Sequence, residues 1–551
     1  MIATALVAVG SPWGPPATAV AQETAPAAEP RGAFTASAYL PLGHWAYPIL
    51  AYWIAAGRIS DLSPIVKPYR RMDVARAVAR LSGGPIESGW EADWLSRLQS
   101  EFASELGSLA RRTPTEPAAD AAVGSGDDAP GALMIYGTLG ATYRTQTHRD
   151  PLRPELGGTF AADRLLERVM LETEGHIAIL AGAFRAGRDG IFLNDAQFPD
   201  GRVVAEKRMP VLDELGVRVE EAYLELQTRY ARVGFGRMYH DWGLPGIDGL
   251  MRSGYAYSEE EISYRFGTAL INLSGAIAPF ADFAADTARY FSIHQLEIRP
   301  SDDFMVTLSE SVIHGGPGQS IVFSYINPVG IWSIARGDDD PPRNAVGGLD
   351  LWWRAIDGLT LFGSLLADAT NSPTSSNSCC QLGGSLGFEL AGLLPGWLFR
   401  ANGSALQSLV YRTTSPWEIY AVEGIGLGWD KSDIYLATLE AEWFGPAGLR
   451  LSPRLDLQWR GEGDFRVPPP SQTELPGFPR ILVGTTETTV RPAVAGSWRT
   501  PLGKAWIDLE WDLGLNIISN YRHAERDDRT ELVATVRAVV ETPRWLIPLG
   551  G

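Results

Sequence analysis

The chain has 551 residues, a formal net charge of −18 and 18 tryptophans. Its acidic balance excludes a general nucleic-acid binder, because phosphate recognition requires clustered Lys and Arg, so no nucleic acid is expected as a partner. Its two cysteines, Cys379 and Cys380, are adjacent, which excludes a disulfide framework and a four-cysteine zinc site. A strained vicinal disulfide and two free thiols are both compatible with this pair.

The first residues resemble an export signal. Segment 1–21 is apolar and ends in Ala19-Val20-Ala21, although no Lys or Arg precedes Arg31; a small-x-small ending is typical of a cleavage site. The following segment 22–39 is rich in Ala, Pro and Glu and is expected to be disordered. The rest of the chain contains no run of 18 uncharged apolar residues, so the sequence predicts no transmembrane helix.

Residues 40–112 are predicted to form three short amphipathic helices that bury one small core. Their apolar residues recur mostly at steps of three and four. They are Trp45, Ile49, Trp53 and Ile54, then Met72, Val74, Val78 and Leu81, then Leu95, Leu98, Phe102 and Leu106. Segment 113–131 is rich in Pro, Ala, Gly and Asp and is predicted to be a linker.

From about residue 132 the hydrophobic period changes to two. In LRLSPRLDLQWR, residues 449–460, every second side chain from Leu449 to Trp459 is apolar or Pro and the others are polar. This alternation is typical of a strand with one apolar and one hydrated face. Tight turns such as Asp357-Gly358 alternate with long polar stretches. The long stretches fall near 145–164, 188–215, 239–257, 278–289, 313–345, 369–383, 413–432, 461–480 and 517–528.

Nine long loops separated by eight tight turns predict a mainly β fold, an outer-membrane β-barrel of about eighteen antiparallel strands over 132–545. A soluble β-sandwich also alternates, but its strands usually have about five or six residues. Many strands here are longer, their polar faces carry repeated charges, and Trp recurs near strand ends, as in interfacial girdles. Closing the sheet satisfies every backbone group that lipid leaves unpaired.

Three stretches carry a family resemblance. Residues 230–257 read YARVGFGRMYHDWGLPGIDGLMRSGYAY, 294–316 read HQLEIRPSDDFMVTLSESVIHGG, and 325–332 read YINPVGIW. In order and spacing they resemble the Wzi family of capsule-assembly proteins, and the resemblance covers about 40–541. One departure is Leu244 between Gly243 and Pro245, where the family pattern leads us to expect a continuous Trp-Gly-Pro run.

The resemblance implies an eighteen-stranded outer-membrane barrel with a helical bundle in the periplasm. It also implies a lectin that attaches capsular or exopolysaccharide to the cell surface, and neither an enzyme nor an open porin. The expected partners are surface polysaccharide and outer-membrane lipid, with no cofactor, and a monomer is expected. Separately, His44-Trp45-Ala46, residues 56–59 and residues 68–71 resemble a surface-layer-homology module, which binds cell-wall polymers. The alternative function is therefore a wall-tethered porin for small solutes.

The predicted ligand-binding residues are Arg237, His240, Asp241, Trp242 and Trp332. Tryptophan faces stack on sugar C–H surfaces, and arginine binds carboxylates such as uronates through two hydrogen bonds. The alternative is structural: Arg and Asp pair across a lumen, and Trp242 fills a plug. The long loops, especially 239–257 with Trp242 and 313–345 with Trp332, are predicted to fold over or into the lumen and to form the polysaccharide site.

No catalytic or metal-binding residues are predicted. The seven histidines show no zinc-ligand spacing, and GIGLGWD at 424–430 lacks the context of a dinucleotide site. A lipase-like arrangement of His240 and Asp241 with Ser309 or Ser311 is the enzymatic alternative. The acidic stretch RGDDDPP at 336–342 is interpreted as a solvated cluster, with a bound divalent cation as the alternative.

Overall fold

The computed structural model describes residues 35–86, 89–110, 131–145, 150–152, 164–191, 217–254, 258–280, 286–332, 343–368, 381–422, 424–471, 474 and 478–549. The predicted export signal, most of the linker, Cys379, Cys380 and the acidic stretch 336–342 lie outside these residues. No described helix is long and apolar enough to cross a membrane.

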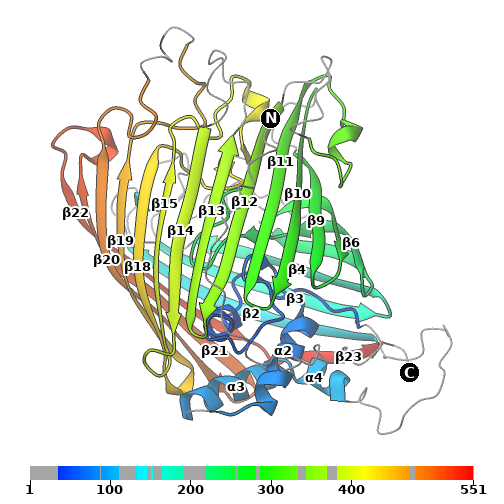
Figure 1. Cartoon of the computed structure of the whole chain (residues 1–551). Helices are drawn as coiled ribbons and strands as arrows, with labels where there is room; N and C mark the ends of the chain where they lie inside the picture. The colour runs from blue at the N-terminus through cyan, green and yellow to red at the C-terminus, as the bar shows by residue number, and fades with distance from the viewer. Residues whose placement is uncertain are drawn as a thin grey trace, which may run out of the picture.

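The chain forms a closed antiparallel barrel of eighteen strands (Figure 1). Each strand pairs with its neighbours in the sequence, and β2 closes the barrel against β22 and β3. The strands are β2 (Gly131–Thr145), β3 (Arg164–Ile177), β4 (Leu180–Ile191), β5 (Val217–Gln227), β6 (Ala231–Met238), β8 (Glu259–Gly267), β9 (Ile271–Phe280), β10 (Thr287–Ser301), β11 (Phe304–Pro317), β12 (Arg343–Ile356), β13 (Leu359–Asp368), β14 (Gln381–Ala391), β15 (Trp397–Leu406), β18 (Ile434–Phe444), β19 (Leu449–Arg460), β20 (Glu487–Leu502), β21 (Ala505–Ser519) and β22 (Arg529–Glu541). The strand count predicted from the alternation of long loops and tight turns is confirmed.

A short extra strand, β23 (Trp545–Leu549), pairs with the first residues of β2. The barrel sheet therefore runs from Gly131 to Leu549, slightly beyond the predicted bounds 132–545. Two further pairs of short strands complete the sheet structure of the described residues. They are β1 (Val66–Lys67) with β7 (Asp241–Trp242), and β16 (Ala421–Val422) with β17 (Ile425–Gly426).

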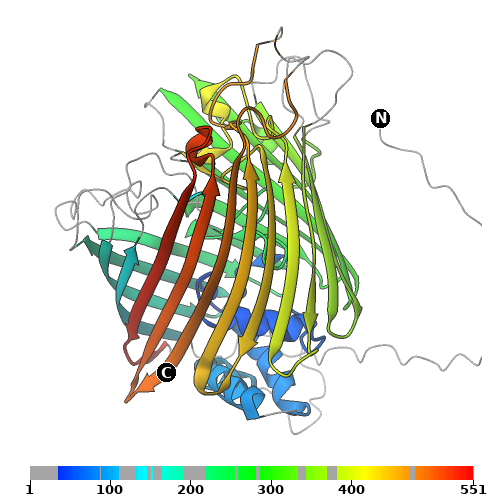
Figure 2. The same cartoon turned by 90° about the vertical axis from the view of Figure 1, so that its left-hand side faces the viewer.

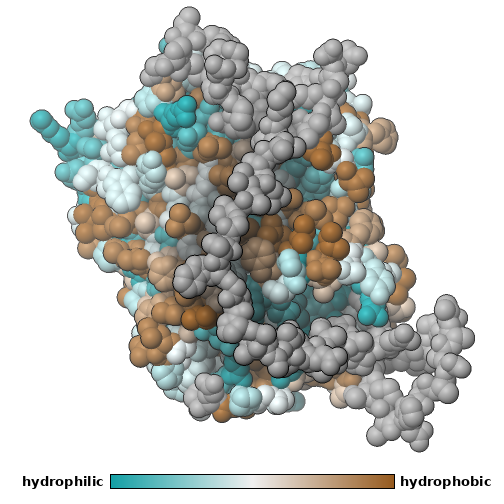
Figure 3. All heavy atoms as spheres, viewed as in Figure 1, coloured by the Kyte–Doolittle hydropathy of each residue, from teal (hydrophilic) through white to brown (hydrophobic). Residues whose placement is uncertain are grey.

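The alternation of side chains assigns the two faces of the wall. On β19, Trp459 is exposed, whereas Asp456, Gln458 and Arg460 are buried. Exposed leucines such as Leu365 and Leu439 occupy the outward positions of other strands. Figure 3 shows apolar residues spread over the outer wall. The apolar face of each strand is therefore the outer face, as expected for a barrel in lipid.

Four helices, not the predicted three, form the helical unit: α1 (Ala46–Ala55), α2 (Arg71–Gly83), α3 (Gly89–Glu101) and α4 (Ala103–Ala110). The third predicted helix is divided at Phe102, whose ring is fully buried and lies under the Arg71 guanidinium. Figure 2 shows the helices gathered at the end of the barrel where the tight turns lie. Trp94 Nε1 donates to the carbonyl of Gly445 in one of these turns, at 2.9 Å.

The segment before the helices is also packed, in contrast to the prediction that 22–39 is disordered. Ser37 N donates to Gln227 Oε1 at 3.0 Å, and Tyr39 N donates to Tyr223 Oη at 2.8 Å. Both partners lie on β5, and all four residues are buried. Residues 35–39 are ordered because the inner face of the barrel satisfies their backbone groups.

The helical unit also forms an ion pair with a side chain of the barrel wall that faces the lumen. Arg71 of α2 pairs with Glu101 at 3.0 Å, Glu105 at 2.7 Å and Glu174 of β3 at 3.3 Å. Burial alone would raise the pKa of Glu101, but Arg544, His44 and Arg71 hold it well below its usual range. A buried cation shared by three carboxylates thus fastens the helical unit to the barrel wall.

Candidate functional site

A loop that follows β6, residues 239–254, crosses the lumen; we call it the luminal loop. Near its start, β7 pairs with β1 of the N-terminal segment, with Trp242 opposite Val66. Further along, the Gly246 carbonyl accepts a hydrogen bond from Asn402 Nδ2 on β15 at 3.4 Å. Since β6 and β15 lie eight strands apart in an eighteen-stranded ring, the loop spans most of the lumen. The predicted inward folding of this loop is confirmed over 239–254.

The loop between β15 and β18 packs against the luminal loop and holds it through hydrogen bonds; its described residues are 407–422 and 424–433. Tyr411 Oη donates to the carbonyl of Leu250, and Tyr420 Oη donates to that of Met251 at 2.8 Å. The two tyrosine rings stack with their centroids 4.9 Å apart. Trp429 Nε1 donates to the Asp248 carbonyl at 3.0 Å. We call this second loop the clamp loop.

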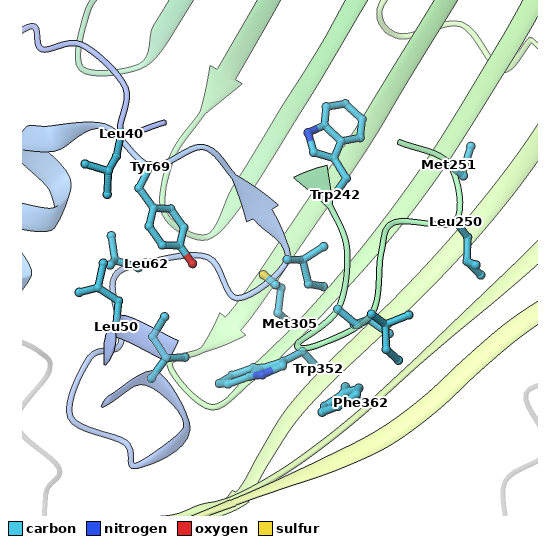
Figure 4. Close-up of a cluster of buried hydrophobic side chains, with 14 of the residues drawn as sticks. Leu40, Leu50, Leu62, Tyr69, Trp242, Leu250, Met251, Met305, Trp352 and Phe362 are labelled. Atoms are coloured by element: carbon cyan, nitrogen blue, oxygen red, sulfur yellow. The ribbon is translucent and has the colours of Figure 1, made fainter. Parts of the chain in front are cut away.

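One continuous apolar cluster joins the helical unit, the luminal loop and the barrel wall (Figure 4). The N-terminal segment contributes residues such as Leu40, Leu50, Leu62 and Tyr69, whereas the wall contributes Met305, Trp352 and Phe362. Trp242, Leu250 and Met251 of the luminal loop belong to the same cluster. Burial of this many apolar side chains makes the loop part of the hydrophobic core. Together with the N-terminal segment and the clamp loop, the luminal loop forms a plug on this side of the lumen.

Three of the predicted ligand-binding residues, His240, Asp241 and Trp242, come together in the luminal loop. His240 Nε2 lies 2.6 Å from Glu261 Oε1, Asp241 pairs with Lys67 at 3.2 Å, and Trp242 is 6 % exposed. Burial and then the neighbouring Arg252 cation lower the pKa of His240. The indole of Trp242 lies within the plug, so its face is covered in this conformation.

The other two predicted residues lie elsewhere, so the five do not form one site. Arg237 lies two positions after the exposed Phe235 on β6, so its side chain also points to the outer face of the wall. Its partner on the neighbouring strand is Glu260. Trp332 is buried against His294, with the ring centroids 4.0 Å apart. His294 is opposite Glu310, on the outer face of the wall. The prediction that loop 313–345 folds over or into the lumen is therefore wrong for its described residues 318–332.

The lumen wall opposite the plug is lined by ion pairs. Arg537 and Glu510 lie 3.1 Å apart, and each side chain is about 40 % exposed. Nearby strands add Arg454 with Asp456 at 2.9 Å. Asp512 pairs at 3.1 Å with Arg491, which is itself buried beneath Asp150. We call the inner face of β18 to β22, apart from the end that meets the helical unit, the polar sector. Its charged groups offer donors and acceptors suited to hydroxyl and carboxylate groups.

A pocket of about 160 Å³ lies at the seam between the helical unit and the barrel. Arg499 lies between two indoles there, 5.2 Å from the ring centroid of Trp45 and 4.9 Å from that of Trp506. The remaining lining residues are Arg97, Ser100, Glu101, Lys504, Glu541, Thr542, Pro543 and Arg544. The cation–π stack joins Trp45, the residue before α1, to β20 and β21, in keeping with a fastening role.

Sequence reasoning missed the residues that hold the plug. Tyr411 and Tyr420 belong to a long loop that also contains Gly and Trp. This composition is the one sequence feature that could have indicated a packed loop. Gln227 and Arg71 are polar and carry no signal, because their partners lie on elements far away in the sequence.

The described residues do not form the lipase-like arrangement that was the enzymatic alternative. Ser311 Oγ shares a 2.6 Å hydrogen bond with Tyr420, and Ser309 Oγ accepts one from Gln295 at 3.1 Å. Within the described part of the chain, no hydrogen bond joins either serine to His240, and no group of three metal-ligating side chains occurs.

No family model matches the chain, and no curated protein matches its sequence. Among solved structures, it is similar to Wzi, described as a carbohydrate-binding β-barrel and outer-membrane protein involved in group 1 capsule assembly in Escherichia coli. The TM-score is 0.58 at 14 % identity, over 90 % of this chain and 96 % of that one.

Porins align more loosely. OccK11 of Pseudomonas aeruginosa gives a TM-score of 0.42 at 11 % identity, over 75 % of this chain and 96 % of that one. The surface-layer-homology resemblance finds no support in these comparisons. The likeness to Wzi shows the fold, and the chain thus has the eighteen-stranded architecture of an outer-membrane barrel.

Proposed function

We propose that this protein is a plugged outer-membrane barrel that attaches capsular or exopolysaccharide to the cell surface. The observation that carries the proposal is the luminal loop, which crosses from β6 to β15 and is part of the hydrophobic core. A diffusion porin needs a continuous aqueous path, whereas a protein that retains polymer at the surface does not. The similar fold of Wzi, a carbohydrate-binding β-barrel, also supports the proposal.

The polymer is proposed to contact the polar sector and the long loops above it. Arg537 and Glu510 are half exposed and would meet sugar hydroxyls or carboxylates directly. Each contact contributes about 1 kcal/mol, but many weak contacts along one chain multiply through avidity. Because both signs of charge line this sector, neutral and acidic polymers can both be accommodated.

In the proposed orientation the long loops face outward and the helical unit lies in the periplasm. The protein is expected to act as a monomer without a cofactor and without enzymatic activity. The helical unit is then available to a cell-wall polymer, the partner expected for the wall-tethered porin alternative. That alternative requires a steady conductance, which the plug opposes.

Deletion of the gene tests the proposal. We expect polymer to be released into the medium while the total amount of polymer is unchanged, and the purified protein to show low conductance in planar bilayers. The double variant Arg537→Gln with Glu510→Gln should release part of the polymer. Arg80→Gln, which removes the ion pair between Arg80 of α2 and Asp61 in the helical unit, is the control. Large steady conductance together with unchanged polymer retention in the deletion strain would favour the porin.

A further inference from the structure

The described part of the loop after β11, residues 318–332, lies against the outer wall of the barrel; we call it the strap. Strand β11 fixes the direction of each side chain. Met305 and Ile313 belong to the core inside the lumen, whereas Leu308 is 48 % exposed on the other face. Glu310 and His314 have the parity of Leu308 and therefore point outward. The turn η2 (Phe323–Tyr325) of the strap is the green helical turn beside β10 in Figure 1.

The strap covers polar side chains that would otherwise face lipid. Trp332 stacks on His294, and its backbone N–H donates to Glu310 Oε2 at 2.7 Å. His294 and Glu310 are themselves 3.5 Å apart. Higher on the wall, the Tyr325 ring lies 4.8 Å from the ring of His314. The strap also hydrogen-bonds to the wall through Tyr325 Oη, which accepts from Arg343.

The covered positions fall within the height of the membrane. A strand tilted by about 40° rises about 2.6 Å per residue, so an apolar band about 25 Å tall requires about ten residues. On β11 the outward apolar residues Phe304, Val306 and Leu308 begin beside the tight turn. They account for about 10 Å of the band by the same rise. The rest of the band falls on Glu310 to His314, the positions under the strap.

The outer surface of the strap replaces the missing apolar wall. Phe323, Val329 and Ile331 are 80 %, 76 % and 59 % exposed, and residues 318–332 contain no charged residue and no histidine. Exposed apolar patches on proteins usually mark contacts with another apolar phase or partner. Here the patch continues the outward row that contains Leu308, so it continues the lipid-facing surface.

We propose that the strap is embedded in the membrane leaflet at the loop end of the barrel and contacts lipid acyl chains through Phe323, Val329 and Ile331. In the proposed orientation this is the outer leaflet. The strap would thereby complete the apolar band over β10 to β12 and keep the His294–Glu310 pair away from lipid. This inference concerns the outer wall and goes beyond the proposed polysaccharide contact.

Spin labels on single cysteines test the position of the strap. Cys379 and Cys380 are first replaced by Ser, and Val329→Cys or Phe323→Cys is introduced into the full chain. Leu365→Cys, on the outward face of β13 and 49 % exposed, is the lipid-facing control. Ser471→Cys, in an exposed loop, is the aqueous control. The labelled proteins are placed in phosphatidylcholine–phosphatidylglycerol vesicles, and the collision rates with oxygen and with a charged nickel chelate are compared.

The oxygen-to-nickel ratio at residues 323 and 329 should equal that at residue 365. It should exceed that at residue 471 about tenfold or more, because hydrocarbon excludes a charged chelate. A ratio like that of residue 471 would overturn the proposal. Spin–spin broadening between copies at residue 329 that persists on dilution with lipid would also overturn it, since the patch would then bind a second copy of the chain.

Discussion

We expect two tyrosine hydroxyls in the clamp loop to determine how firmly the plug is held. Tyr411 and Tyr420 donate to the neighbouring carbonyls of Leu250 and Met251, and Tyr420 is also bonded to Ser311. Replacing both tyrosines by Phe keeps the stacked rings and removes only the hydroxyls. The buried carbonyls then lose their partners, while the apolar packing is preserved.

Each lost hydrogen bond to a buried carbonyl costs about 1 to 1.5 kcal/mol. The two sites are adjacent and share a ring stack, so their effects are not strictly additive, and about 2 to 3 kcal/mol is expected for the pair. Since 1.4 kcal/mol is a factor of ten, the fraction of time that the luminal loop is displaced should rise about 30- to 150-fold.

Single-channel recording in planar bilayers measures this fraction. The wild-type protein should show rare brief openings, and Tyr411→Phe with Tyr420→Phe should increase the total open time by the predicted factor. Tyr435→Phe is the matched control, because Tyr435 points outward and is 39 % exposed. Open times of the double variant equal to those of the wild type would show that these hydroxyls do not hold the plug. A steadily conducting wild type would refute the closed lumen itself.

Three further predictions concern the same assembly. Because the pKa of His240 is lowered from 6.5, its neutral form is the packed one; stability of the plug is complete above about pH 6.5 and falls as the pH drops below it. Openings should thus increase from pH 7 to pH 5, and His240→Gln should reduce this increase. Arg71→Ala removes the buried cation that three carboxylates share, although Glu101 keeps Arg544 and Glu174 keeps Arg185; breaking such a buried pair costs about 3 to 5 kcal/mol, so limited proteolysis should cut the helical unit sooner, but not in Arg76→Ala. In intact cells lacking the native cysteines, an impermeant maleimide should label Ser471→Cys but not Gln99→Cys until the outer membrane is opened; equal labelling of both would contradict the periplasmic helical unit.

The barrel was predictable because its signal is local and repeated. Alternation along segments such as 449–460 and the order of long loops and tight turns are both visible in the sequence, and each is imposed by lipid on one face. The helical unit was also visible through its apolar spacing. Its division at Phe102 was not, because Leu98, Phe102 and Leu106 keep a helical spacing across the break.

The arrangement of the loops was only partly predictable, because composition does not determine on which side of the wall a loop packs. The luminal loop and the strap both contain Gly, Pro and Trp, yet Trp242 enters the lumen and Trp332 covers the outer wall. A signal for the strap exists in the strand before it. Polar Glu310 and His314 continue the outward parity of Leu308, and outward polar residues within the membrane height require a cover.

The two loops together make the two halves of the barrel physically different. Strands β10 to β12 are covered inside by the plug and outside by the strap, so substitutions on either face there should alter packing and closure. The polar sector keeps hydrated ion pairs such as Arg537 with Glu510 on its inner face, and its outer face carries exposed residues such as Leu513 and Val536. Binding energy for a polymer requires groups that are accessible before the polymer arrives. Contacts with polysaccharide are therefore expected in the polar sector and the loops above it. Replacing Trp242, in contrast, should change how firmly the plug closes the lumen.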